Sequence, residues 1–182
     1  MNPPEILEKM LHDGATQEEA FSLFDQLETL DMNEIWGLWK GEEITTGHPF
    51  EGLLQASGWY GKKFIDEEHV HPLVMQRGNG DLYSINPAFI PLNLPFDKIP
   101  KKLITPAMKI LRPVLKTKKS AARLRLIKYR GKISVAMVYD KKGIIDIFRK
   151  VEADTLLGIM DIKELQSDKS YFFVLRRVKE RN

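Results

Sequence analysis

The first thirty residues carry apolar side chains at a helical spacing. Thr16 and Glu19 have the spacing of a capping box, in which each side chain binds a free backbone amide of the first turn. A helix of about fifteen residues is therefore predicted to begin at Thr16, with an apolar face made of Ala20, Phe21, Leu23, Phe24, Leu27 and Leu30. A shorter helix precedes it and ends at Gly14. Residues 1–32 are predicted to form a helical cap on the rest of the protein.

From residue 35 onward the pattern changes to short extended segments. Residues 35–44 and 58–64 are predicted strands, separated by a turn at 46–49 and a helical turn at 50–57. Five prolines between residues 70 and 100 exclude a regular helix and disfavour central strands. This stretch is therefore predicted to form short edge strands and loops.

The last third of the chain has the pattern of short strands separated by turns, at residues 122–129, 133–139, 144–151, 155–162 and 171–178. Their connections are too short for crossover helices, so the strands are expected to pair as an antiparallel meander. A long meander curls, and closure into a barrel removes its exposed edges. We therefore predict a mainly β protein, an antiparallel β-barrel capped by the N-terminal α-helices. Residues 33–182 are expected to form a single barrel body with segments at about 33–97, 98–121 and 122–182.

Two glycine–tryptophan signatures lie about twenty residues apart, at Gly37–Gly41 and Gly58–Lys62. Glycine permits close approach of the backbone and indole covers apolar surface, a combination that suits the end of a tightly coiled barrel. We expect Trp39 to be structural, closing a barrel end and packing on the N-terminal helix. Trp59 and Tyr60 are adjacent in a strand and face opposite sides, so one of them is a candidate for lining a cavity.

Composition excludes several classes of site. The 182 residues are 43% hydrophobic and 29% charged, which is ordinary for a globular protein with a sizeable core. The absence of cysteine excludes disulfides, a thiol nucleophile and cysteine-containing zinc sites. No apolar run approaches the ~20 residues that span a bilayer, and the N-terminal segment is acidic where a secretory signal is basic. We therefore expect a cytoplasmic protein.

The net charge of +3 conceals a large asymmetry. Residues 98–132 contain thirteen Lys or Arg and no Asp or Glu, which leaves 15 of the 28 basic residues against all 25 acidic ones elsewhere. Apolar side chains repeat at helical spacing within this segment, at Leu103, Ala107, Ile110, Leu111 and Val114, and its cations include Lys101, Lys102, Lys109 and Arg112. Pro113 is expected to limit the helix to about two turns.

The basic segment has three interpretations. A short apolar stripe with a basic rim suits the interface of an anionic membrane. The same helix suits a lid over a barrel mouth, and these two roles are compatible. Nucleic-acid binding ranks third, because Tyr129 alone interleaves the cations and no known recognition module is present.

Charged and polar residues offer candidate groups for a barrel interior. His48 lies in a Gly-His-Pro turn and is the best single candidate for a polar group at the mouth. Arg123 and Arg125 project from one face of a strand, and Asp140 and Asp146 lie on neighbouring strands. These four form either a solvated face with weak ion pairs or a buried site for a carboxylate or phosphate. The solvated face is the simpler interpretation.

His69 and His71 share one face of an extended segment, as a pair of metal ligands would. No third ligand lies near them in the sequence, so exposed loop histidines are the simpler interpretation and no metal site is predicted.

Several motifs resemble those of the GXWXG-motif family, namely Gly37–Gly41, residues 47–54 (GHPFEGLL), Gly58–Phe64 and Asn86-Pro87. In that family a second domain of unknown function usually follows, and its pattern resembles residues 122–125, 130–131, 136–140, 145–150, 157–161 and 171–175. The resemblance covers roughly residues 15 to 178, with one departure at Lys141-Lys142-Gly143. The Gly-x-Trp element is also similar to that of lipocalin-like and haem-binding nitrobindin-like barrels, which hold apolar ligands or haem. No histidine follows residue 71, which counts against haem.

The resemblance implies a lipocalin-like β-barrel, and we expect it to bind a lipid or another hydrophobic small molecule without catalysis or a cofactor. Candidate ligand-binding residues are Trp59, Tyr60, His48, Arg123, Arg125, Tyr139, Asp140 and Asp146, and candidate lid or membrane residues are Lys101, Lys102, Lys109 and Arg112. The alternative is an isomerase, cyclase or hydratase that uses the same cavity. Its acid–base groups would come from Tyr60, His48, Tyr139, Asp140 and Asp146. A third class is an interaction protein that works through the basic segment.

Overall fold

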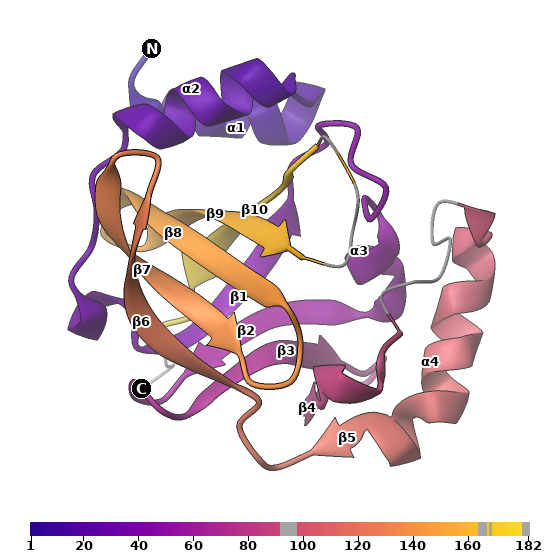
Figure 1. The fold of residues 1–182 in the computed structure, drawn as a ribbon. Helices are drawn as coiled ribbons and strands as arrows, with labels where there is room; N and C mark the ends of the chain where they lie inside the picture. Colours follow the sequence, from indigo (N-terminus) through magenta and orange to yellow (C-terminus); the bar gives the residue numbers. More distant parts are fainter. Residues whose placement is uncertain (92–97, 164–166, 168, 180–182) are drawn as a thin grey trace.

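The computed structural model describes residues 1–91, 98–163, 167 and 169–179. Within them, eight antiparallel strands form a closed, barrel-like ring (Figure 1). The ring consists of β1 (Gly37–Glu43), β2 (Trp59–Phe64), β3 (Val70–Gln76), β6 (Ala122–Tyr129), β7 (Lys132–Tyr139), β8 (Ile144–Glu152), β9 (Thr155–Ile162) and β10 (Tyr171–Arg177). Its order is β2-β1-β10-β9-β8-β7-β6-β3, and the β2–β3 pairing closes it. The predicted mainly β, antiparallel fold is confirmed.

Strands β1 to β3 form one arc of this ring and β6 to β10 form the other, and the two arcs meet at two pairings. β1 pairs with β10 on one side and with β2 on the other, and β3 pairs with β6 where Val70 faces Ala122. β4 (Leu82–Ile85) and β5 (Lys116–Thr117) continue the sheet outward from β3. The five strands predicted after residue 121 each lie within one residue of their expected bounds.

β3 differs from the expectation of edge strands and loops after residue 70. It belongs to the ring although it contains Pro72, which cannot donate a backbone hydrogen bond. The β2–β3 pairing shifts its register between Gly61 and Lys63, where Val74 and His71 are their respective partners. Pro72 therefore lies in the irregular part of the ladder, where the missing donor breaks no regular sequence of hydrogen bonds.

Two helices cover the outer face of one side of the ring. α1 (Pro3–Asp13) and α2 (Gln17–Gln26) each begin with a formed capping box, including the predicted pair of Thr16 and Glu19. Their buried side chains pack on outward-facing residues of β7, β8, β9 and β10 (Figure 1). α2 is shorter than expected, although Leu27 and Leu30 beyond it are still buried.

Trp39 is fully buried inside the ring, as expected of a structural residue. Its Nε1 donates to the carbonyl oxygen of Ile35 at 2.6 Å, at the end of the short helix η1 (Met32–Ile35). The expectation that Trp39 packs on the N-terminal helix is wrong, because α1 and α2 bury their apolar side chains in a separate cluster outside the ring.

The two glycine–tryptophan signatures contact each other. β1 and β2 are paired, and the indole ring of Trp59 lies directly on Gly41, where a Cβ atom would stand 2.0 Å from the ring. Glycine at position 41 is therefore required by close approach. The sequence predicts the glycine–indole packing, but the partners come from different signatures.

The remaining helices lie in two connections, the first in that between β1 and β2 and the other two in that between β4 and β5. They are α3 (Leu53–Ser57), η2 (Pro87–Phe89) and α4 (Lys101–Leu115). The helical turn predicted at 50–57 is confirmed, but the expectation of a two-turn helix ended by Pro113 is wrong, because α4 continues through both Pro106 and Pro113. Each proline removes one donor, which leaves a backbone carbonyl on an exposed helix to bind water. None of the helices in the described part of the chain has the length and apolar composition needed to cross a membrane.

Candidate functional site

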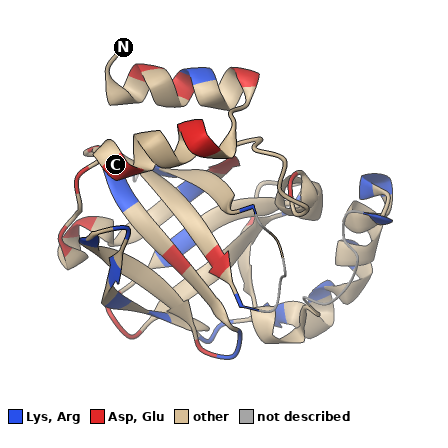
Figure 2. Cartoon of the chain, turned by 45° about the horizontal axis from the view of Figure 1, so that its top comes forward, with Lys and Arg blue, Asp and Glu red and all other residues tan. Residues whose placement is uncertain are grey.

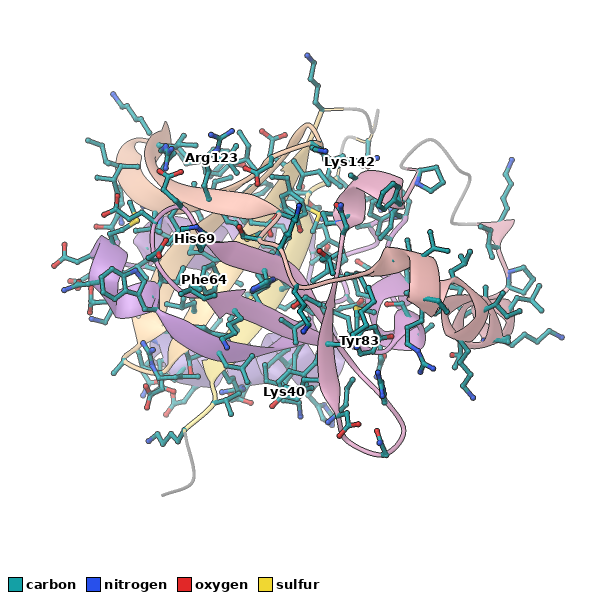
Figure 3. The ribbon with its side chains drawn as sticks, turned by 90° about the horizontal axis from the view of Figure 1, so that it is seen from below. Lys40, Phe64, His69, Tyr83, Arg123 and Lys142 are labelled. Atoms are coloured by element: carbon teal, nitrogen blue, oxygen red, sulfur yellow. The ribbon has the colours of Figure 1, made fainter. Side chains whose placement is uncertain are left out.

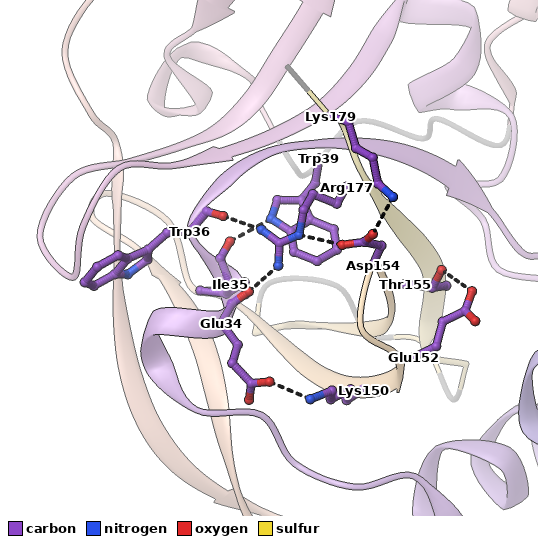
Figure 4. A network of polar contacts seen from close by, with 10 residues as sticks. All are labelled: Glu34, Ile35, Trp36, Trp39, Lys150, Glu152, Asp154, Thr155, Arg177 and Lys179. Atoms are coloured by element: carbon purple, nitrogen blue, oxygen red, sulfur yellow. Dashed lines mark hydrogen bonds and ion pairs between the residues drawn. The ribbon is translucent and has the colours of Figure 1, made fainter. Parts of the chain in front are cut away.

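β10 runs between two different ends of the ring. At its last residue, the Arg177 guanidinium lies 4.2 Å from the ring centroid of Trp39 and donates to the carbonyl oxygen of Trp36 at 2.6 Å. Arg177 also donates to Asp154 Oδ1 at 2.9 Å, within the polar network of Figure 4. This network closes the Trp39 end. Tyr171, the first residue of β10, lies at the opposite end, which we call the pocket end.

A buried ion pair crosses the interior of the ring. Lys62 of β2 places its Nζ 2.7 Å from Oδ2 of Asp146 on β8, and both side chains are at most 1% exposed. Lys62 Nζ also donates to the carbonyl oxygen of Pro72 at 3.3 Å and lies 4.9 Å from the ring centroid of Phe173. Asp146 faces inward because it lies two positions from both Ile144 and Phe148 and so shares their face of β8, which is turned to the interior.

Aromatic rings surround this pair. Lys62 Nζ lies 5.6 Å from the ring centroid of Trp59 and 5.9 Å from that of Tyr139, distances at which ring faces attract a cation. Phe173 and Phe148 meet edge to face with centroids 6.1 Å apart. The interior around the pair is therefore packed and dry, so the ion pair interacts strongly but also loses its hydration.

Part of the polar capacity of this interior is unused. Among the described residues, neither Asp146 Oδ1 nor Trp59 Nε1 has a hydrogen-bond partner, although both atoms are buried. Burial raises the pKa of Asp146, and Lys62 acts in the opposite direction. Burial also raises the pKa of Tyr139 well above its ordinary value, so its hydroxyl stays protonated. A free acceptor, a free donor and a buried cation thus lie in one small region, which is unusual for a purely structural core.

A small apolar pocket opens beside this region at the pocket end. Its volume is about 80 Å³, and its lining combines Tyr139 and Tyr171 with Phe50, Leu53, Leu54, Leu73, Pro87, Ile90, Lys142, Ile144 and Met160. Tyr139 therefore belongs both to the pocket wall and to the surroundings of Lys62. Part of the wall comes from the strands of the ring, and the rest comes from residues 50–54 and 87–90 and from Lys142 in the turn between β7 and β8.

His48 organises one of these outer wall segments. Its Nδ1 accepts a hydrogen bond from the Phe50 amide at 3.1 Å, and its ring meets those of Phe50 and Tyr171 at 5.3 Å in each case. Burial lowers the pKa of His48 to about 4, so the ring is neutral near pH 7. Glu51 accepts from the backbone amide of His48 at 2.8 Å. His48 therefore positions Phe50 at the pocket, while its own ring does not line it.

Three of the predicted site residues lie on the outside of the protein. Arg123 is 3.4 Å from Asp140, and Arg125 is 2.8 Å from Glu68, with both arginine side chains more than 40% exposed. The buried site considered for these arginines and Asp140 is wrong, because inward positions on β6 belong to Ala122 and Leu124 instead. Arg123, Arg125 and Asp140 instead belong to a solvated face with exposed ion pairs, the simpler of the two interpretations. Asp146 alone of the four charged candidates faces the interior.

Tyr60 and the two neighbouring histidines also lie outside the pocket. Tyr60 is partly exposed, whereas adjacent Trp59 is buried. His69 is exposed and places Nδ1 2.8 Å from Asp66 Oδ1, close to Arg123 at the junction of β3 and β6 (Figure 3). Burial lowers the pKa of half-buried His71. Among the described residues, no group of three or more His, Asp or Glu side chains is arranged to hold a metal ion.

The four candidate lid residues lie on α4. α4 contributes no side chain to the lining of the pocket, and it is attached instead to α3, through a hydrogen bond of 2.7 Å from Thr105 Oγ1 to the Ala56 carbonyl oxygen. Since Leu53 and Leu54 of α3 line the pocket, α4 stands behind this wall.

Sequence reasoning missed two residues of the site, Lys62 and Tyr171. Both were detectable by alternation, because Lys62 lies two positions before the interior residue Phe64, and Tyr171 lies two positions before Phe173. Lys62 stands beside Lys63, which is exposed, and the sequence does not distinguish the interior lysine from the surface one. Because lysine is rarely buried, the sequence pattern alone does not favour an interior position for Lys62.

Known proteins support the resemblance seen in the sequence. Residues 22–80 match the family described as GXWXG protein, and residues 120–177 match a domain of unknown function, DUF4334. A crystal structure of a protein from Thermomonospora curvata is similar over 98% of this chain and 100% of that one, with 29% sequence identity and a TM-score of 0.72. None of the curated proteins matches the chain.

Proposed function

For this chain, in which a GXWXG segment is followed by a DUF4334 segment, we propose non-catalytic binding of a small hydrophobic molecule inside a lipocalin-like barrel. The observation that carries the proposal is the apolar pocket beside the buried pair of Lys62 and Asp146. The apolar part of the ligand lies among the pocket's aliphatic side chains. Its polar group points toward Tyr139, which separates the pocket from Lys62.

The polar groups define what the ligand's head must offer. A carboxylate, carbonyl or hydroxyl oxygen can accept from the hydroxyl of Tyr139, the residue of the pocket wall whose ring lies next to Lys62. Hydrogen bonds to such buried groups are favourable because the groups are already desolvated. The ligand class is therefore an apolar chain or ring with one oxygen-containing end.

The size of the pocket limits the ligand unless its walls move. A volume of about 80 Å³ equals the liquid volume of roughly three water molecules, whereas ligand sites usually enclose about 300–1,000 Å³. The outer wall, at residues 50–54 and 87–90, does not belong to the closed ring. We propose that these segments separate when a larger ligand binds, while the strands keep their pairing.

Enzymatic use of the same interior is the second candidate. It is favoured by the raised pKa of buried Asp146, because a carboxyl group with a pKa nearer neutrality is better suited to exchange protons. Tyr139, protonated by burial, would supply a second hydrogen-bond donor to a substrate oxygen. The reaction class would be isomerisation, cyclisation or hydration, in which protons are moved without a redox cofactor.

Native mass spectrometry of gently purified protein tests the proposal first. Bound apolar mass that leaves on denaturation supports it. Titration with 1-butanol, 1-hexanol, 1-octanol and 1-decanol then measures the adaptable volume, since each buried CH₂ group should improve affinity about fourfold for as long as the walls yield.

Matched variants assign the binding to the pocket. Leu54→Trp fills the pocket and should weaken octanol binding at least tenfold, whereas Leu82→Trp adds the same ring at an exposed position and should not. Ligand-free protein together with no saturable binding of any alcohol would overturn the proposal. Conversion of a co-purified molecule during incubation would favour the enzyme instead.

A further inference from the structure

α4 exposes part of its apolar face. Ile104, Met108 and Leu115, which lie on one side of the helix, are the apolar residues turned toward the protein. Beside them on the helical surface, four large apolar side chains remain between 48% and 78% exposed, namely Leu103, Ile110, Leu111 and Val114. These four residues, which we call the outer stripe, lie along one strip of the helix, because Ile110 follows Leu103 by seven positions, or about two turns, and Val114 lies four positions after Ile110 and three after Leu111. Exposed apolar clusters of this kind mark interaction surfaces.

The opposite side of α4 is basic and its charges are unpaired. Lys101, Lys102, Lys109 and Arg112 lie there, and none of them forms an ion pair with any described residue. The three arginines that follow on the ring differ, because Arg123, Arg125 and Arg130 are all bound to carboxylates. Four cations of the basic segment that lack a carboxylate partner among the described residues therefore lie together on α4.

The distribution of charge over the protein indicates which side would face an anionic surface. Figure 2 shows basic but no acidic residues on α4, which projects from one side of the ring. α1 and α2 lie elsewhere on the ring and carry acidic residues, including Glu5, Glu18 and Glu19. An anionic surface would therefore attract α4 and repel the N-terminal helices.

We propose that α4 docks the protein on the surface of an anionic lipid bilayer. The outer stripe enters the boundary between headgroups and acyl chains, and the lysines and Arg112 extend to the lipid phosphates and carboxylates. At about 22 Å, the fifteen-residue helix is long enough to lie in the interface and too short to span it. This surface is separate from the pocket, so docking does not depend on the proposed ligand.

Other occupants fit the same surface less well. Nucleic-acid grooves engage cations, but sequence-tolerant binding also uses aromatic stacking, and α4 has no aromatic residue. A second copy that packed its own outer stripe on this one would cover the apolar side but leave the cations of both helices without partners. A bilayer containing anionic lipid satisfies both the apolar and the basic side of the helix.

Vesicle flotation with the full chain tests the proposal. Vesicles of phosphatidylcholine alone and with 30% phosphatidylserine are compared at 50 and 300 mM NaCl. We expect at least tenfold stronger partitioning to the anionic vesicles at low salt, and a marked loss at high salt, because each cation near such a surface contributes about a fivefold factor.

Two variants separate the apolar from the electrostatic part. Ile110→Ser with Val114→Ser should weaken binding at both salt concentrations, and Lys102→Glu with Lys109→Glu should remove most of the dependence on anionic lipid. The matched controls are Ile133→Ser and Lys128→Glu, which alter exposed residues of the ring and should leave partitioning unchanged.

Four outcomes would overturn the proposal. They are absence of vesicle binding, equal binding to both vesicles, insensitivity to both double variants, and equally tight binding to single-stranded or duplex DNA. A dimer seen by light scattering and dissolved by the serine variants would assign the outer stripe to a second copy instead. Circular dichroism confirms that the variants are folded, as expected for exposed positions. None of these assays involves an alcohol or another pocket ligand, so failure here leaves the proposed function open to its own test.

Discussion

Replacing Lys62 with methionine removes the charge at the centre of the ring while keeping most of the side chain's volume. The carboxylate of Asp146 then loses the ammonium that lies 2.7 Å away, in surroundings where its side chain is fully buried. An isolated buried carboxylate is costly, and breaking such a pair from one side typically destabilises a protein by about 3–5 kcal/mol. For a chain of this size, the melting temperature should fall by roughly 6–20 °C.

The sign of the pH dependence follows from the pKa of Asp146. Burial raises this pKa in the folded protein above its value of 3.8, and Lys62 opposes the rise. The folded state therefore binds a proton more readily than the unfolded chain, so stability decreases as the pH rises through the folded pKa. Removal of Lys62 lets the pKa of Asp146 rise further, so the pH range over which stability decreases extends to higher pH. The Lys62→Met variant should lose much more stability at pH 7.5 than at pH 4.5.

A double-mutant cycle measures the pair. Asp146→Asn alone leaves Lys62 charged and unpaired, and it should also be strongly destabilising at pH 7.5. Lys62→Met combined with Asp146→Asn removes both charges, and it should recover most of the loss because a buried pair adds little net stability over neutral groups. Urea unfolding followed by circular dichroism at the two pH values gives the four free energies of unfolding. Additive losses, or a Lys62→Met variant equally unstable at both pH values, would refute a buried ion pair.

Three further predictions concern the remaining features. Gly41→Ala should lower the free energy of unfolding by about 1–3 kcal/mol and alter tryptophan fluorescence, because the new Cβ meets the Trp59 ring. In the control Gly78→Ala the new Cβ meets nothing within 4 Å, so the free energy of unfolding should change by no more than about 0.5 kcal/mol. Burial lowers the pKa of His48 from 6.5 to about 4, so between these two pH values the unfolded chain binds more protons than the folded protein. The stability of the protein should therefore fall as the pH drops through this interval. His48→Asn, which retains an acceptor for the Phe50 amide, should make the melting temperature less dependent on pH over this range. Arg125→Ala should leave both stability and octanol affinity unchanged within error, since its ion pair is exposed, and a lost affinity would return Arg125 to the binding site.

The arrangement of strands was largely predictable because turns and alternation are local signals. The turns that join β6, β7, β8 and β9 contain two to four residues, and alternation identifies the two faces of each strand. The extent of α4 was not predictable in this way. Beyond Pro113, Leu115 is buried in the core and its carbonyl oxygen accepts from the Asn86 amide at 2.8 Å, and such contacts between distant segments leave no local trace in the sequence.

The candidate site was harder to predict than the fold. Alternation alone cannot say which face of β6 is inward, and Arg123 and Arg125 were candidates only for that reason. Leu124 between them faces the interior, so the arginines face solvent. Asp146 has the same ambiguity with the opposite outcome. A charged residue is assigned to the interior only when its neighbours at two positions on either side are known to be buried, as Ile144 and Phe148 are.

The placement of Lys62 follows from the second glycine–tryptophan signature itself. In a regular strand Trp59 and Lys62, three positions apart, would face opposite sides, yet both are buried within the ring. The register of β2 against β3 shifts on both sides of Gly61, as in a β-bulge, and this extra residue brings the two side chains to one face. A Cβ atom at position 61 would stand 1.9 Å from the carbonyl oxygen of Trp39, so only glycine permits the bulge there. The same contact between the two signatures that shapes the barrel therefore also turns a lysine into its interior.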